Sequence, residues 1–334
     1  MKKLILKTSL ILLFILGLFT IILSTKGYET NKFNKVISNK IIKKNKNILL
    51  ELEKIKIKLE VKKLSLFIET ENPEINYKNL KIPVKNIKVY LDFFSLIKSD
   101  PKIKKIDISS KEINVEQLKK IIIKTKPSNL NSLIINKVNN GKIKTTLEIF
   151  YNKDFELDNF IARGEVTEMG AIVNKDIFLK NTSFNFFSDS TNVLIKNIKS
   201  EADGLLIENG NIQIIKNKNV NIQSELSTKM ILNKKNLKKY LTNENIFENF
   251  NKDSSVKINL DHNLSITLDN TYKFINYEFN STGKVEKAFL KTTQPFKNIF
   301  LKNDINELKL KKSDLNIRYA SDNKNKINVI GKYS

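Results

Sequence analysis

Residues 55–61 read IKIKLEV, and in this stretch an apolar residue alternates with a charged one at every step. Successive side chains of a β-strand point to opposite faces, so strict alternation predicts a strand with one apolar and one charged face. The same period recurs along the chain, for example in 256–260, 264–268 and 315–319. We therefore expect a mainly β domain over 47–334, built from antiparallel strands, whose apolar face must be buried against something.

Turn and helix signals separate these runs. An asparagine or aspartate followed by glycine favours the tight turns that join antiparallel strands, and apolar residues at a spacing of three or four favour helix. We predict turns at Asn140-Gly141, Asp203-Gly204, Asn209-Gly210 and Asp269-Asn270, a bend at Gly164–Gly170, and short helices within 28–46, 93–97, 115–124, 234–241 and 245–250.

The N-terminal segment has the composition of a membrane helix. Residues 8–25 are 18 residues without a charge, and a helix of that length spans about 27 Å, close to the apolar thickness of a bilayer. A cleaved signal peptide is the alternative, but no alanine precedes Ala162, and residues 24–26 (STK) form a poor cleavage site. We therefore expect an uncleaved anchor.

Lysines set the expected orientation of this anchor. Lys2, Lys3 and Lys7 precede the apolar run, which favours a cytoplasmic N-terminus. The expected organisation is a cytoplasmic N-terminus and single transmembrane anchor over 1–25, a juxtamembrane helical segment over 26–46, and a domain outside the cytoplasm.

Composition argues against several classes of protein. The net charge is +24, but Arg163 and Arg318 are the only arginines. Arginine is the preferred side chain for bidentate contacts to phosphate and guanine, so we expect no nucleic-acid partner. The chain has no cysteine, which excludes disulfides, thiol catalysis and cysteine-ligated metals.

No catalytic constellation is present in the sequence. His262 is the single histidine, and its neighbours Asp261 and Asn263 favour a turn. Carboxylates such as Glu60 and Glu69 lie among lysines and are expected to form solvated pairs across strands. We expect a protein that is not an enzyme and that uses no cofactor and no metal.

One segment adds a resemblance to a known family. Asn86–Ile123 reads NIKVYLDFFSLIKSDPKIKKIDISSKEINVEQLKKIII, in which a strand, a short helical stretch, a strand and a short helix follow one another. With the preceding anchor and the strand-rich stretch 162–240, this organisation resembles the AsmA-like family of proteobacterial envelope proteins, which includes TamB. Known bridging members of the family are much longer than this chain.

The resemblance implies a fold and a function. It implies an extended, twisted antiparallel β-sheet that forms a hydrophobic groove, with a few short helices, in a protein anchored in the inner membrane and exposed to the periplasm. It also implies phospholipid acyl chains as partners, and a role in phospholipid transport between membranes or, with a partner there, in outer-membrane assembly.

The residues leave two arrangements open, a groove that takes lipid and a closed β-sandwich with a scaffolding role. For a groove, the run Ile55, Ile57, Leu59 and Val61 is the expected lining near the membrane. A carboxylate introduced at Ile57 should then displace lipid, whereas one at the charged position Lys58 should be tolerated.

Overall fold

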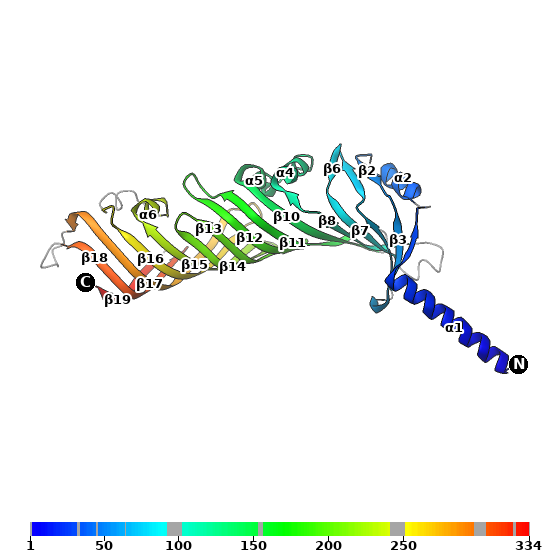
Figure 1. The fold of residues 1–334 in the computed structure, drawn as a ribbon. Coiled ribbons are helices and arrows are strands. Elements are labelled where there is room, and N and C mark those ends of the chain that lie inside the picture. The colour runs from blue at the N-terminus through cyan, green and yellow to red at the C-terminus, as the bar shows by residue number, and fades with distance from the viewer. Residues whose placement is uncertain are drawn as a thin grey trace. The chain divides into compact units, whose positions relative to one another are not determined.

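The computed structural model describes residues 2–31, 34–44, 46–63, 65–91, 102–152, 156–240, 251–296, 305–322 and 325–333. Strands dominate these residues (Figure 1). The helices are α1 (Lys2–Thr25), α2 (Asn34–Lys44), α4 (Val115–Ile123), α5 (Asn129–Lys137) and α6 (Lys234–Tyr240), with a 3₁₀ turn η1 (Val61–Lys63). The strands are β1 (Tyr28–Thr30), β2 (Ile48–Glu51), β3 (Ile55–Glu60), β4 (Ser65–Glu71), β5 (Glu74–Tyr77), β6 (Leu80–Ile82), β7 (Val84–Leu91), β8 (Ile103–Ser110), β9 (Ile113–Asn114), β10 (Val138–Tyr151), β11 (Leu157–Ile172), β12 (Phe178–Ser188), β13 (Asn192–Ala202), β14 (Leu205–Lys216), β15 (Val220–Asn233), β16 (Ser255–Leu268), β17 (Phe274–Phe296), β18 (Ile305–Ala320) and β19 (Lys326–Tyr333).

The described strands form one long antiparallel sheet and one small sheet. The large sheet has 16 strands among the described residues, in the order β1-β3-β4-β7-β8-β10-β11-β12-β13-β14-β15-β16-β17-β18-β19, with β9 beside β10. The small sheet has the order β2-β5-β6. Because β1 and β19 stand at the two ends of the large sheet's order, that sheet is open. The expected mainly β, antiparallel fold is confirmed.

The chain divides into two compact units, which we describe separately. The N-terminal unit comprises residues 1–113, 117–126 and 144–163, and the C-terminal unit comprises 114–116, 127–143 and 164–334.

In the N-terminal unit, α1 is a single apolar helix joined to the sheet by a short connection. Leu6–Thr25 is long and apolar enough to cross a membrane, with a mean hydropathy of 2.4, and only 6% of this span is buried. The helix ends at Thr25, and the chain continues through Gly27 into β1, which pairs with β3. Helix α2 follows, and the side-chain amide of Asn34 donates to the carbonyl oxygens of Leu52 and Glu53 at 2.8 Å each. These bonds fix the start of α2 to the chain between β2 and β3.

In the C-terminal unit, one end of the strands carries a small hydrophobic core. The core consists of Leu232, Val256, Val285 and Ala288, and partly buried side chains such as Met230 pack against it. Register places Leu232 opposite Val256 and Val256 opposite Ala288, while Val285 lies opposite Ile258, so the core covers two adjacent rows across β15, β16 and β17.

Two of the predicted turns are confirmed and four predicted breaks are wrong. Asp203-Gly204 joins β13 to β14, and Asp269-Asn270 lies between β16 and β17. By contrast, Asn140-Gly141 lies within β10, Gly164–Gly170 within β11, Asn209-Gly210 within β14 and His262 within β16.

The wrong predictions share a physical cause. Residues that favour turns locally are held in strands by neighbours on both sides, and the irregularity becomes a bulge rather than a chain reversal. The register of β14 against β15 shifts between Ile207 and Asn209. Glu168 in β11 has a left-handed backbone with φ of 54°. In β16, His262 pairs with both Leu226 and Ser281.

The helix predictions have mixed outcomes. α4 and α6 confirm the segments 115–124 and 234–241, and α2 lies in the predicted juxtamembrane segment, preceded there by β1. The predicted helices within 93–97 and 245–250 lie outside the described residues. Helix α5 was not predicted, although Ser128 gives a cap signal: its Oγ accepts a hydrogen bond from the backbone N–H of Asn131 at 3.1 Å.

Candidate functional site: the two faces of the N-terminal sheet

The register of β3, β4, β7, β8 and β10 separates their side chains into two faces. Ile57 is opposite Ile68 and Ile68 is opposite Val89, while the intervening positions pair Lys58 with Phe67 and Phe67 with Tyr90. We call the first set the apolar face and the second the charged face. The apolar face consists of Ile55, Ile57, Leu59, Leu66, Ile68, Thr70, Ile87, Val89, Leu91, Ile103, Ile106, Ile108, Leu147 and Ile149.

The apolar face is covered at Ile55 and Thr70 and partly exposed in the neighbouring row. Ile55 and Thr70, opposite each other, are only 1% and 7% exposed. The following row is aliphatic across five strands, and all its side chains remain partly exposed: Ile57, Ile68, Val89, Ile106 and Ile149. A contiguous row of partly exposed aliphatic side chains is a candidate surface for an apolar partner.

The four predicted lining residues do not all reach this face. Ile55, Ile57 and Leu59 share it, with Ile55 buried and the other two partly exposed. Val61 lies in η1, after β3 has ended, and is 48% exposed. The alternation that begins at Ile55 therefore continues in sequence for one step beyond the strand.

The charged face carries its own network of ion pairs. Lys58 Nζ lies 2.8 Å from Glu69 Oε2, and Lys88 Nζ lies 3.5 Å from Glu69 Oε1. The side chain of Glu69 is only 8% exposed, so this carboxylate is not the solvated group that the sequence predicts. Burial by itself raises the pKa of Glu69, but the hydrogen bond from Lys58 and the charge of Lys88 outweigh it and leave the pKa below its ordinary value.

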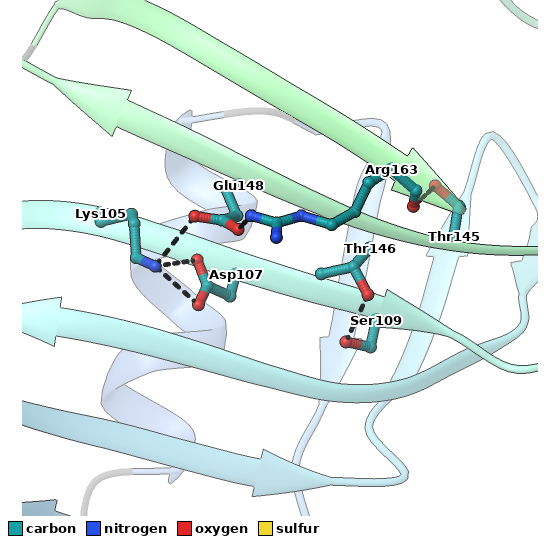
Figure 2. Close-up of polar contacts among 7 residues, drawn as sticks. All are labelled: Lys105, Asp107, Ser109, Thr145, Thr146, Glu148 and Arg163. Carbon is teal, nitrogen blue, oxygen red and sulfur yellow. Dashed lines mark hydrogen bonds and ion pairs between the residues drawn. The ribbon is translucent and has the colours of Figure 1, made fainter. Parts of the chain in front are cut away.

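A second cluster joins β8, β10 and β11 (Figure 2). Lys105 Nζ lies 2.9 Å from Asp107 Oδ1 and 3.1 Å from Glu148 Oε2, and Arg163 also pairs with Glu148. Burial lowers the pKa of Lys105, but hydrogen bonds from its ammonium to Asp107 and Glu148 raise it above the ordinary value. Each carboxylate of the cluster thus has a cation beside it.

Hydroxyl contacts continue beside this cluster. The hydroxyls of Ser109 and Thr146 lie 3.3 Å apart, and Thr145 Oγ1 donates to the carbonyl oxygen of Arg163 at 3.1 Å (Figure 2). Sequence reasoning did not bring these residues together, because it gave the face of each side chain but not the register between strands.

Aromatic rings lie beneath the lysines of the charged face. Phe67 and Tyr90 are buried with ring centroids 5.2 Å apart. Lys105 Nζ lies 4.4 Å from the centroid of Tyr90, and Lys88 Nζ lies 5.5 Å from that of Phe67. Burial raises the pKa of the Tyr90 hydroxyl, and the charge of Asp107 raises it further. The charged face is therefore packed, with ring faces under its cations.

A hollow of about 560 Å³ opens on the charged face next to the end of α1. It is bounded by Ser24 of α1 together with Lys88, Lys105, Arg163, Glu60, Asp107 and Glu148, among others. Three cations and three carboxylates face this space. Their charges balance, so the hollow offers no excess positive charge to a phosphate group.

The chemistry of the two faces differs accordingly. The charged face pairs its own groups, and in the part of the chain that the structure describes no cluster of three histidine or carboxylate side chains could hold a metal ion. The apolar face has a row of side chains that stay partly exposed among the described residues, and it is the candidate binding site. Comparison of the chain with protein-family models, with curated proteins and with solved structures found no match.

Proposed function

We propose that this chain is an AsmA-like, membrane-anchored lipid-binding protein. In this proposal α1 holds the chain in the inner membrane and the sheet lies in the periplasm. The apolar face takes up phospholipid acyl chains, for transport between membranes or for outer-membrane assembly. The observation that supports it best is the partly exposed aliphatic row from Ile57 to Ile149.

The physics of such uptake requires no catalysis. Neighbouring strands lie about 4.8 Å apart, so the five side chains of the row form a continuous aliphatic track across the sheet. Transfer of an acyl chain from water onto an apolar surface contributes about 0.8 kcal/mol per buried CH₂ group. A lipid held through many CH₂ groups is therefore retained without any specific polar contact.

The N-terminal helix supports the membrane part of the proposal. Its side chains are exposed along most of its length, for example Leu13 at 71% and Phe14 at 67%. A helix with apolar side chains exposed all round is suited to lipid rather than to water. Lys2, Lys3 and Lys7 before the apolar run favour the proposed orientation.

A matched pair of variants tests the role of the apolar face. Val89 lies in the middle of the aliphatic row, whereas Val61 lies off the sheet in η1. In Val89→Asp an ionised group occupies the proposed lipid surface, which costs several kcal/mol if lipid covers it. We expect Val89→Asp to lose co-purified phospholipid and Val61→Asp to keep it, as measured by mass spectrometry of the purified full chain.

Thermal unfolding of the same variants separates binding from folding. Retained melting temperature with lost lipid in Val89→Asp supports the proposal. Wild-type lipid content in Val89→Asp contradicts it. A large fall in melting temperature in Val89→Asp, without bound lipid in the wild type, would instead show that the row is a packed core, as the scaffolding alternative requires.

A further inference from the structure

The C-terminal unit also has an apolar face, and one of its rows contains a histidine. In β16, Leu260, His262 and Leu264 alternate with the exposed Asp261 and Asn263. His262 is therefore on the same face of the strand as Leu260 and Leu264. Register across β15 to β19 gives the row Leu226, His262, Ser281, Ile317 and Ile327.

Two polar atoms in this row lack a hydrogen-bond partner among the described residues. His262 Nδ1 and Ser281 Oγ are both buried and unpaired, and Ser281 is only 1% exposed. The two residues are directly opposite each other. A buried polar group without a partner costs about 1–3 kcal/mol, and such groups are rare in native proteins.

The other side of the imidazole is well fixed. His262 Nε2 lies 2.7 Å from Thr228 Oγ1, and the ring stacks on Phe279 with centroids 5.7 Å apart. The Thr228 hydroxyl also has the carbonyl oxygen of Leu260 at 3.4 Å, and when it donates there it accepts from the Nε2–H of His262. Nδ1 is then an acceptor. Burial lowers the pKa of His262 against the opposing effect of Asp261, which favours the neutral ring.

A buried pair of hydroxyls elsewhere on the sheet provides a comparison. Thr182 and Ser200 are also buried, and their hydroxyls bond each other at 2.7 Å. A hydroxyl in such a position can thus be satisfied by its neighbour across the strand. His262 and Ser281 are also on neighbouring strands, directly opposite each other, but Nδ1 and Oγ have no such bond.

We propose that His262 and Ser281 form a subsite on the apolar face of the C-terminal unit for the hydroxyl group of an amphiphilic lipid. The ligand hydroxyl would donate to His262 Nδ1 and accept from Ser281 Oγ, which satisfies both atoms at once. An ester carbonyl can only accept, so it fits the pair less well. This inference rests on the proposed function, because the ligand reaches the subsite through an apolar face that binds lipid.

The single histidine of the chain makes the subsite directly observable. The full chain, without a histidine tag, is labelled with ¹⁵N-histidine in a zwitterionic detergent that has no hydroxyl groups. Monooleoylglycerol, which has free hydroxyls, is compared with methyl oleate, which has only the ester. We expect monooleoylglycerol to shift the Nδ1 resonance and methyl oleate to leave it unchanged.

Variants connect the signal to the two residues. Ser281→Ala removes an unpaired buried hydroxyl, so the fold is expected to persist. The affinity for monooleoylglycerol should fall about three- to tenfold while that for methyl oleate stays constant. His262→Phe keeps an aromatic ring against Phe279 and should lower the same affinity alone. Thr282→Ala, at an exposed neighbouring position, serves as the control.

The outcomes distinguish this inference from the proposed function. If both lipids bind with equal affinity in all variants and Nδ1 does not shift, the subsite is wrong and lipid binding stands. An Nδ1 signal that reports a hydrogen bond in the lipid-free protein and stays the same with monooleoylglycerol identifies a buried water only, which also overturns the subsite. If neither lipid binds, both proposals fail.

Discussion

At the scale of single residues, Glu69 is a nearly buried carboxylate on the charged face. Its carboxylate is almost fully covered, yet it is held between two ammonium groups, Lys58 and Lys88. A buried carboxylate is tolerated when such partners replace the water it has lost. Removal of either partner leaves this covered carboxylate with a single cation, so the sensitivity of this face to substitution is concentrated at a few positions.

The lowered pKa of Glu69 predicts a pH dependence of stability. Its ionised form is favoured in the folded protein, so it contributes stability above its ordinary pKa of 4.5, and this contribution is lost as the pH falls through the lower folded value. In Glu69→Gln this contribution is absent. We expect the stability difference between wild type and Glu69→Gln to be largest near neutral pH and to shrink below about pH 4.5.

Urea unfolding from pH 7 to pH 3 measures this difference. Glu53→Gln is the matched control, because Glu53 is exposed. It should follow the wild-type curve at every pH. A constant difference between wild type and Glu69→Gln across the range would show that the ion pairs of Glu69 do not stabilise the fold.

The sequence predicts that a carboxylate at position 58 is tolerated, but the ion pair of Lys58 with Glu69 argues against this. Lys58→Asp would place a second carboxylate beside the covered Glu69 and remove its 2.8 Å partner. We expect a loss of about 3 kcal/mol in unfolding free energy, as for other broken buried pairs. Lys62→Asp, in the exposed turn η1, should change stability by less than about 0.5 kcal/mol. Equal melting temperatures of the two variants would contradict this assignment.

The residue scale also shows where sequence reasoning stops. Alternation assigns Ile57 and Lys58 to opposite faces, as the structure does. It does not show that Phe67 and Tyr90 share the charged face, although both are in phase with charged neighbours. It also gives no distance between Lys105 and Glu148, because cross-strand partners depend on register, and register depends on turns and bulges.

At the scale of elements, the positions where strands end are predicted poorly by turn-favouring residues. Asp261-His262-Asn263 and Asn209-Gly210 are favourable turn sequences, yet each lies inside a strand. Pairing on both sides outweighs local preference there. The confirmed turns, such as Asp203-Gly204, differ in having apolar runs that pair with each other immediately on either side, for example Ala202 with Leu205.

Glycines inside the long strands have a packing role that can be tested. A Cβ atom at Gly283 would lie 2.0 Å from the carbonyl oxygen of Asn259, in the neighbouring strand β16. Because that atom belongs to the backbone, the two strands would have to move apart. We expect Gly283→Ala to lower the unfolding free energy by about 1–3 kcal/mol, measured by urea unfolding. Thr282→Ala, one residue away and exposed, should have little effect, and equal midpoints for the two would refute the close approach of the strands.

At the scale of the whole molecule, the described lysines of the sheet occur in two arrangements. In the N-terminal unit the described lysines of the charged face have carboxylates beside them, as Lys58 and Lys105 do. In the C-terminal unit Lys257, Lys287 and Lys311 lie in one row across β16, β17 and β18, and Lys257 also pairs with Glu286. Lysines in such rows repel other chains and keep a large open sheet from associating through its faces or edges. The net charge of +24 therefore has a role in solubility that needs no anionic partner.

The order of strands in the C-terminal unit follows the order of the chain, and this has a consequence for how the unit opens. From β12 to β18 each strand pairs with the strand before it and the strand after it. Among the described strands β19 pairs with β18 alone, and its Ile327 and Ile330 are 59% and 71% exposed. Detachment of β19 therefore leaves the remaining ladder intact, and amide hydrogen exchange should be fastest there and become slower toward the interior strands. Pairing between consecutive strands closes only short loops. The same sequential order therefore allows folding of the unit to start at any hairpin and to proceed strand by strand, as in a repeat protein.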